Sequence, residues 1–289
     1  MPKPCFLIVN PTSGTYSQKK IDHIMAILAE RGLPPLLMPT ASAADPARFA
    51  ARICQENEAP LILVAGGDGT LNGVLNGLAP GAATLGVIPL GTSNVLAREL
   101  EIHSVEDAVK RVIRGECRPI PVGEMICGGE SRRFLLMAGV GVDGAVVRGV
   151  RLPEKRLVGK AAYALSALRL LFAWDRTPLM VTADGSNLSC DSVIVCNAAK
   201  YGGNFVLSPG GGLFTPGFQV ICISGGRLAY LKIFLRLLLG KISGSRSVTI
   251  FTASELKVEG GKAVQCDGDF FGCAPLTLKS IPDFVRVIV

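Results

Sequence analysis

Residues 61–70, with the sequence LILVAGGDGT, restrict the possible fold more than any other part of the chain. The apolar run at the start predicts a strand that is buried on both faces, as in a parallel sheet. Three glycines and one aspartate follow, and Leu71, Val74 and Leu75 then recur at helical spacing. A strand, a short glycine-rich loop and a helix in this order are typical of a doubly wound α/β layer.

The same alternation covers about the first 120 residues, and the pattern changes near Pro121. Before that point, further continuous apolar runs predict strands at 6–10, 36–38 and 85–88. Beyond it, short β-rich runs lie at 134–138, 179–183, 192–196, 219–224, 248–252 and 255–258. Helical patterns interrupt these runs at 160–174 and 227–239. The chain is therefore predicted to contain an α/β layer followed by a mostly antiparallel β domain, and the last apolar run, 284–289, fits either sheet.

The glycine-rich loop has the composition of a phosphate-binding site. Gly66, Gly67 and Gly69 let the backbone approach a ligand closely, and they permit positive φ angles that would point successive N–H groups at one anion. The N-terminus of the following helix adds further N–H donors. Asp68 would repel phosphate oxygens unless a cation such as Mg²⁺ bridges them, so the loop predicts a metal–phosphate site. The alternative, a tight turn, does not require three glycines and an acid.

Two more loops of similar composition follow predicted strands. Residues 89–94 read PLGTSN, and residues 10–14 read NPTSG. Because ligands of open α/β sheets bind at the carboxyl ends of the strands, the three loops are predicted to line one crevice. The chain has no GxxxxGK[ST] pattern, which excludes a P-loop protein.

Composition narrows the classes of partner. The formal net charge of +7 suits a nucleotide or an anionic lipid, while the scattered basic residues carry no recognised nucleic-acid-binding motif. Nine cysteines without a CxxC pair are typical of reduced thiols in a cytosolic protein, and two histidines make a Cys/His zinc site unexpected. The N-terminal residues do not resemble a signal peptide, and no uninterrupted apolar run reaches the ~18 residues of a transmembrane helix.

Three further segments have patterns that a functional site or plain structure could explain. The basic, leucine-rich residues 227–246 fit either an anionic membrane surface or a core helix with a solvated edge. Residues 139–144, GVGVDG, match the pattern GxGxxG but lie too far downstream for a first dinucleotide-binding βαβ unit. Residues 267–269, Asp-Gly-Asp, follow a predicted strand and are either a β-turn, which Asp-Gly favours, or part of a functional site.

Taken in order, these motifs resemble the diacylglycerol kinase/sphingosine kinase family of lipid kinases. The motifs Asn-Pro-x-Ser-Gly, Gly-Gly-Asp-Gly-Thr-Leu-Asn and Pro-Leu-Gly-Thr-x-Asn begin at Asn10, Gly66 and Pro89, and counterparts of other family segments follow at 138–143, 159–163, 197–203 and 267–269. The resemblance implies an N-terminal doubly wound α/β nucleotide-binding domain over 1–121, to which a last strand at about 280–289 returns. It also implies a mostly antiparallel, β-sandwich-like lipid-substrate domain over 122–279. Soluble NAD kinases also use Gly-Gly-Asp-Gly, so an NAD kinase-like enzyme is an alternative.

The resemblance further implies an activity and its residues. The expected enzyme uses ATP and Mg²⁺ to phosphorylate a primary hydroxyl of a diacylglycerol or sphingoid/ceramide-type lipid, in a cleft between the two domains, within lipid metabolism and phospholipid biosynthesis. Asp267 is the expected base and Asp68 the acid of the metal network, holding Mg²⁺ through water, although the two roles could be exchanged. The residues expected to bind nucleotide are Asn10, Ser13, Gly14, Gly66, Gly67, Asp68, Gly69, Thr70, Gly91, Thr92, Asn94 and Lys160.

The expected location is cytoplasmic and peripheral to an anionic membrane surface, with nucleotide and lipid as partners, no nucleic acid, and a homodimer left open.

The chain departs from the family pattern at positions that bear on activity. Pro121 stands at about the position of a supporting Asp, and residues 214–217 carry no acid where many bacterial relatives bind a structural metal. We therefore expect no structural metal site, and a catalytically weak lipid-binding relative is a second alternative.

Overall fold

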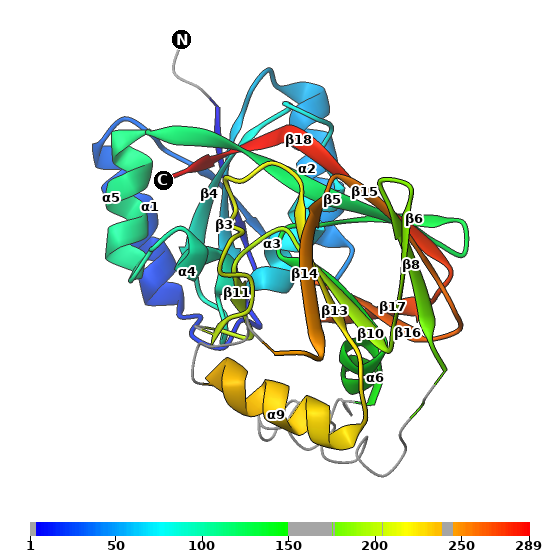
Figure 1. Ribbon diagram of the computed structural model, residues 1–289. Helices are drawn as coiled ribbons and strands as arrows, with labels where there is room; N and C mark the ends of the chain where they lie inside the picture. Colours follow the sequence, from blue (N-terminus) through cyan, green and yellow to red (C-terminus); the bar gives the residue numbers. More distant parts are fainter. Residues whose placement is uncertain (1–3, 150–174, 176, 204, 239–244) are drawn as a thin grey trace. The chain divides into compact units, whose positions relative to one another are not determined.

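The computed structural model describes residues 4–149, 175, 177–203, 205–238 and 245–289 (Figure 1). The chain divides into two compact units. The first comprises Met1–Val122, Gly202–Asn204 and Pro282–Val289, and the second comprises Gly123–Tyr201 and Phe205–Ile281. The helical segment predicted at 160–174 lies outside the described residues.

The first unit is built on a parallel sheet with the strand order β2-β1-β3-β4-β18. Its elements are β1 (Cys5–Val9), α1 (Gln18–Glu30), β2 (Leu36–Pro39), α2 (Asp45–Glu56), β3 (Leu61–Gly66), α3 (Asp68–Asn76), β4 (Thr84–Pro89), α4 (Val95–Glu99) and α5 (Val105–Arg114). Every residue of β3 is buried, as its continuous apolar sequence predicts. The last strand, β18 (Leu276–Ile288), pairs in parallel with β4 through Arg286 and Thr84.

Local capping explains where two of these helices begin. Ser104 with Asp107 three residues later predicts a helix start in the sequence, and the Ser104 side chain does accept a hydrogen bond from Asp107 N and cap α5. The pair Asp45-Pro46 in the sequence predicts an N-cap at Asp45 for α2, and this prediction is wrong, because Ala44 holds the N-cap position and Asp45 is the first helical residue. The Asp45 carboxylate instead accepts hydrogen bonds from Ala41 N and Ser42 N, so it fixes the loop before the helix.

The second unit is a two-layered β-sandwich. One sheet is antiparallel throughout, with the order β14-β13-β10-β7-β16-β17. In the other, β18, β15, β8 and β9 also pair antiparallel. The strands are β5 (Cys117–Cys127), β6 (Glu130–Phe134), β7 (Met137–Val140), β8 (Leu179–Ala183), β9 (Ser186–Cys190), β10 (Ser192–Cys196), β13 (Phe218–Ile223), β14 (Val248–Ala253), β15 (Glu255–Glu259), β16 (Ala263–Cys266) and β17 (Asp269–Cys273). The short pair β11 (Lys200–Tyr201) and β12 (Phe205–Val206) is separate.

One apolar core joins the two layers of this sandwich. Val181, Leu256 and Leu278 of one sheet and Val195 and Val220 of the other belong to a single buried cluster. The α/β and β-sandwich-like fold classes predicted from the sequence are therefore confirmed.

Two predictions for the second unit need comment. The single strand expected at 134–138 is instead the end of β6, a break, and the start of β7, because the amides of residues 135–137 bind a side chain rather than a neighbouring strand. The helix expected at 227–239 is present as α9 (Arg227–Leu238). A further helix, α6 (Val142–Gly149), follows β7. Among the described residues, no helix is long and apolar enough to cross a membrane.

Candidate active site

Three loops at the carboxyl ends of β1, β3 and β4 are tied to one another. Thr15 donates two hydrogen bonds to Leu90 O, from its N at 2.9 Å and from its Oγ1 at 3.1 Å. Asn10 Nδ2 donates to Thr70 Oγ1 at 3.2 Å, which links the first loop to the start of α3. Because β1, β3 and β4 are parallel neighbours, their loops share one edge of the sheet, and the predicted grouping of the three loops is observed.

The glycines of these loops allow close backbone approach. A Cβ on Gly91 would lie 2.5 Å from Gly67 Cα, and a Cβ on Gly66 would lie 2.6 Å from Thr70 Oγ1. Gly69 differs, since a Cβ there would meet no atom of the protein within 4 Å. The expectation that these glycines adopt positive φ is wrong: Gly67 has φ −99° and ψ −176°, which is extended backbone. Glycine is required at position 66 because the Thr70 side chain leaves no room for a Cβ, and at position 91 because the backbone of Gly67 leaves none.

Asp68 joins the second and third loops. Its Oδ2 accepts a hydrogen bond from Val95 N at 3.0 Å, and its Oδ1 accepts one from Leu96 N at 3.1 Å. These are the first two residues of α4, whose own N-cap residue, Asn94, makes no side-chain cap. Asp68 therefore caps α4 from a separate loop, a function that the sequence did not reveal. Each carboxylate oxygen keeps a second lone pair, so the predicted role in a metal network stays a prediction.

The donors and acceptors of the loops fit a nucleotide with its cation. Asn94 has φ +47°, and its Nδ2 donates to Gly91 O at 2.8 Å while its buried Oδ1 has no partner. The amides of Asp68 and Gly69 begin α3, where N–H groups have no partner within the helix and favour an anion.

The remaining predicted ligands are partly placed. Ser13 and Gly14 lie in the first loop, where a Cβ on Gly14 would lie 3.1 Å from Thr92 Oγ1 of the third loop. Lys160 lies outside the described residues. In the part of the chain that the structure describes, no group of three or more His, Cys, Asp or Glu side chains could hold a metal ion by itself.

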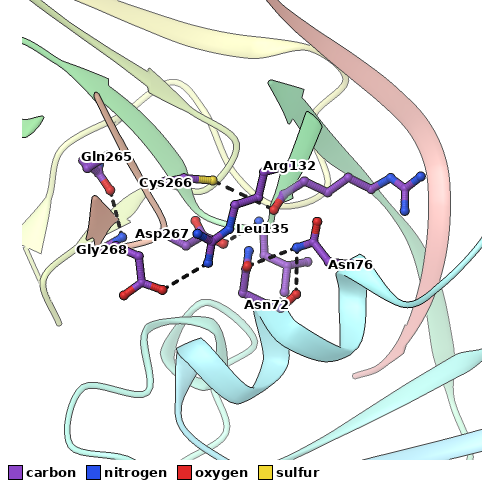
Figure 2. Close-up of polar contacts among 10 residues, drawn as sticks. Asn72, Asn76, Arg132, Leu135, Gln265, Cys266, Asp267 and Gly268 are labelled. Carbon is purple, nitrogen blue, oxygen red and sulfur yellow. Dashed lines mark hydrogen bonds and ion pairs between the residues drawn. The ribbon is translucent and has the colours of Figure 1, made fainter. Parts of the chain in front are cut away.

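Asp267 occupies a turn of the second unit (Figure 2). Asp267 and Gly268, with φ angles of +47° and +87°, form the two-residue connection between β16 and β17, as Asp-Gly favours. A functional role for Asp267 stays a prediction. The Asp267 carboxylate accepts hydrogen bonds from three consecutive amides, Leu135 N at 2.8 Å, Leu136 N at 2.9 Å and Met137 N at 2.9 Å. It therefore holds the break between β6 and β7.

The neighbouring Asp269 has a different environment. Its side chain is 52% exposed and forms an ion pair with Arg132 at 3.1 Å. The structure also reveals a buried acid that the sequence reasoning missed, Asp143, which binds Tyr201 and Gln265. Its one signal in the sequence was its place within the glycine-rich residues 139–144.

Comparisons with known proteins agree with this architecture. Residues 4–125 match the family model of the diacylglycerol kinase catalytic domain. Residues 137–289 match the model of the YegS C-terminal NAD kinase beta sandwich-like domain. A diacylglycerol kinase of Bacillus subtilis (strain 168) is 29% identical over 293 residues, covering 98% of this chain and 95% of that protein.

Solved structures show the same fold. The crystal structure of a diacylglycerol kinase from Bacillus anthracis strain Sterne gives a TM-score of 0.74 at 21% identity, over 99% of this chain and 96% of that chain. A yeast NADH kinase complexed with NADH gives a TM-score of 0.52 at 13% identity, over 99% of this chain and 83% of that chain, and is a distant likeness of fold alone. The two family models, which follow one another along the chain, show that it belongs to the diacylglycerol kinase family and is a lipid kinase.

Proposed function

We propose that this lipid kinase transfers the γ-phosphate of ATP to a primary hydroxyl of a diacylglycerol or a sphingoid/ceramide-type lipid. The observation that carries the proposal is the linked set of three loops at the ends of β1, β3 and β4. Gly67 and Gly91 keep these backbones in contact, and the first amides of α3 are oriented for phosphate oxygens. Phosphoryl transfer depends mainly on positioning and charge stabilisation, which such a cluster of amides supplies.

We assign the cation to the same loops. Asp68 would hold Mg²⁺ through water, because its carboxylate oxygens retain acceptor capacity beside their bonds to α4. When bound, the cation neutralises charge that develops on the phosphate oxygens. The capping bonds from α4 keep the Asp68 carboxylate in one orientation, so that its remaining lone pairs point in fixed directions.

Asp267 is the proposed base for the lipid hydroxyl. Three backbone amides fix its carboxylate, which is the rigidity that a group accepting a proton in a single geometry needs. The same bonds also support a purely structural role for Asp267. The two roles differ in their consequences, because only a base contributes to the rate of a fully folded enzyme.

The direct test is an assay with γ-labelled ATP against diacylglycerol, sphingosine, ceramide and NAD, with the products identified by mass. Phosphorylation of one lipid class, dependent on Mg²⁺, would support the proposal. Phosphorylation of NAD alone would replace it with the NAD kinase-like alternative. Lipid binding without any product would indicate a catalytically weak relative.

A single methyl group tests the phosphate site. Gly69→Ala places a Cβ where the protein has no atom within 4 Å, so the fold has no reason to weaken. If phosphates approach this backbone, the KM for ATP should rise about tenfold or more, equivalent to about 1.4 kcal/mol. Gly261→Ala is the matched control, since a Cβ there also meets no protein atom and the residue is exposed. Equal KM values for both variants would exclude close phosphate binding at α3.

We further propose that α9 contacts an anionic membrane surface. Leu228, Leu231 and Leu235 are 74%, 47% and 51% exposed, and their i, i+3, i+7 spacing places them on one face of the helix. Lys232 is exposed on the same helix. An apolar stripe beside basic charge is the composition of helices that lie in a lipid interface.

Vesicle sedimentation tests this contact. Binding to vesicles that contain phosphatidylglycerol should fall with Lys232→Glu and with added salt, which screens charges beyond ~8 Å at physiological ionic strength. Lys19→Glu makes the same charge change at an exposed position on α1 and should have a smaller effect. Likewise Leu231→Ser should weaken binding, while Leu36→Ser, at a residue 61% exposed on β2, should not. Equal losses in the paired variants would remove α9 from the membrane contact.

A further inference from the structure

The glycine-rich residues 139–144 build a buried polar connection in the second unit. Asp143 lies in the first turn of α6 and is 7% exposed. Its carboxylate occupies space that a side chain on β7 would fill, because a Cβ on Gly139 would lie 2.0 Å from Asp143 Oδ2. A Cβ on Gly144 would lie 2.0 Å from Ala263 O, so α6 packs directly on the backbone of β16. These glycines make room for Asp143 and its helix, which gives the GxGxxG pattern a reason other than dinucleotide binding.

A chain of hydrogen bonds leads from Asp143 to the turn that carries Asp267. Tyr201 Oη donates to Asp143 Oδ1 at 2.5 Å, and Gln265 Nε2 donates to Asp143 Oδ2 at 2.6 Å. At its other end Gln265 accepts a hydrogen bond, from Gly268 N to Oε1 at 2.8 Å (Figure 2). Gln265 is 2% exposed, so water does not compete for either bond.

The Asp143 carboxylate determines which way the Gln265 amide points. Its oxygens accept from Tyr201 and Gln265, so the Gln265 NH₂ group must face Asp143 and its carbonyl must face Gly268 N. The opposite orientation would set the NH₂ group against Gly268 N–H and one oxygen against the Asp143 oxygen. Both contacts would be repulsive in a buried site.

We propose that Asp143, Gln265 and Tyr201 are positioning residues that hold the Asp267–Gly268 turn, and through it Asp267, for the reaction. The inference rests on the proposed role of Asp267. Gln265 fixes the Gly268 amide from one side, and the amides of residues 135–137 fix the Asp267 carboxylate from the other. Misplacing a reacting group by about 1 Å can cost about 10²-fold in rate, so a small shift of this turn would appear in kcat.

The test substitution is Gln265→Met, which keeps the length of the side chain and removes both of its hydrogen bonds. We expect kcat to fall about tenfold or more while the KM for ATP stays within about twofold. Gln219→Met is the matched control, because Gln219 lies in the same sheet, on β13, and its Oε1 accepts a hydrogen bond from Ser208 Oγ at 2.5 Å. The control has no bond to the turn and should change kcat by less than about twofold.

A double-mutant comparison with Asp267→Asn distinguishes a positioning role of Gln265 from a general loss of stability. In an Asp267→Asn background, Gln265→Met should lower kcat no further, because the group that it positions is already gone. Equal fold-losses in both backgrounds, or equal losses for Gln265→Met and Gln219→Met, would overturn the inference. If Asp267→Asn alone retains full kcat, the proposed role of Asp267 fails, which is a different result.

Hydrogen exchange provides a readout that does not depend on activity. Gln265→Met should speed exchange of the Gly268 amide and of the amides of residues 135–137, while Gln219→Met leaves them unchanged. Unchanged protection in Gln265→Met would overturn the inference even if the wild-type kinase activity were absent. Should Gln265→Met fail to fold, Tyr201→Phe can replace it, because it removes only the hydroxyl that donates to Asp143. The kinetic comparison with Asp267→Asn and the hydrogen-exchange comparison with Gln219→Met are then repeated with Tyr201→Phe.

Discussion

Replacing Asp267 by Asn should destabilise the second unit, by an amount that follows from three hydrogen bonds. Asn tolerates the left-handed backbone of this position as Asp does, so the change is confined to one oxygen. With the amide oxygen in place of Oδ1, the bonds to Leu136 N and Met137 N remain but lose their charge, and the amide NH₂ group faces Leu135 N–H. One unsatisfied buried donor costs about 1–3 kcal/mol, and the loss of charge weakens each remaining bond by up to about 1 kcal/mol. The total is about 1–5 kcal/mol.

Thermal unfolding and steady-state kinetics test this together. A loss of about 1–5 kcal/mol should lower Tm by about 2–20 °C in a protein of this size. Asp269→Asn is the control, because its exposed pair with Arg132 is worth about 0.2–1 kcal/mol. An unchanged Tm for Asp267→Asn would refute the reasoning from the three amides. Kinetics at a temperature where both variants are folded then measure the contribution of Asp267 as a base. Loss of a base should lower kcat by about 10²–10⁴-fold.

Three other predictions follow from the same geometry. Asp68→Asn should lower stability by about 1–2 kcal/mol in urea unfolding, because one of the two α4 amides loses its acceptor, and should abolish turnover of the folded enzyme if Asp68 serves the cation. Gly91→Ala should cost about 1–3 kcal/mol and weaken ATP binding in calorimetry, because its Cβ would meet Gly67 Cα at 2.5 Å; an unaltered Tm would contradict that contact. Burial raises the pKa of the Asp143 carboxyl, and hydrogen bonds from Tyr201 and Gln265 offset part of the rise. The stabilisation from protonated Asp143 is therefore full at low pH and is lost as pH rises through the raised pKa. Asp143→Asn should accordingly gain stability relative to wild type as pH rises above the ordinary range of a carboxyl group, and a difference that does not change with pH would contradict this titration.

The fold was predictable because its signals are local. The continuous apolar run of β3 marks a strand buried on both faces, and Ser104 with Asp107 marks the start of α5. The break between β6 and β7 was not predictable in the same way. Residues 134–138 are apolar enough for a strand, but the amides that would extend it bind Asp267, which lies about 130 residues further along the chain. A hydrogen bond over that separation leaves no periodic trace in the sequence.

The grouping of the three loops of the candidate site was predictable, and the bonds within that group were not. Parallel strands bring their carboxyl ends to one edge, so the loops at Asn10, Gly66 and Gly91 were expected to lie together. Composition also showed that glycine was needed, but it could not distinguish a positive φ from a close contact. The structure has the close contact between Gly67 and Gly91, which depends on the spacing of two strands rather than on either loop.

Asp68 and Asp267 use their oxygens in the same way, although they lie in different units. Each sits in a glycine-containing loop, and each accepts consecutive backbone amides of a segment distant in sequence, at residues 95–96 and 135–137 respectively. The Asp68 carboxylate thus holds the start of α4, and the Asp267 carboxylate holds the start of β7. Inactivity of an Asp→Asn variant is therefore not sufficient to identify a catalytic acid in this protein, because the same substitution removes a structural acceptor. The residue whose kcat loss exceeds what its Tm loss explains is the one that acts on the substrate, and the paired measurement decides between Asp68 and Asp267 as the base.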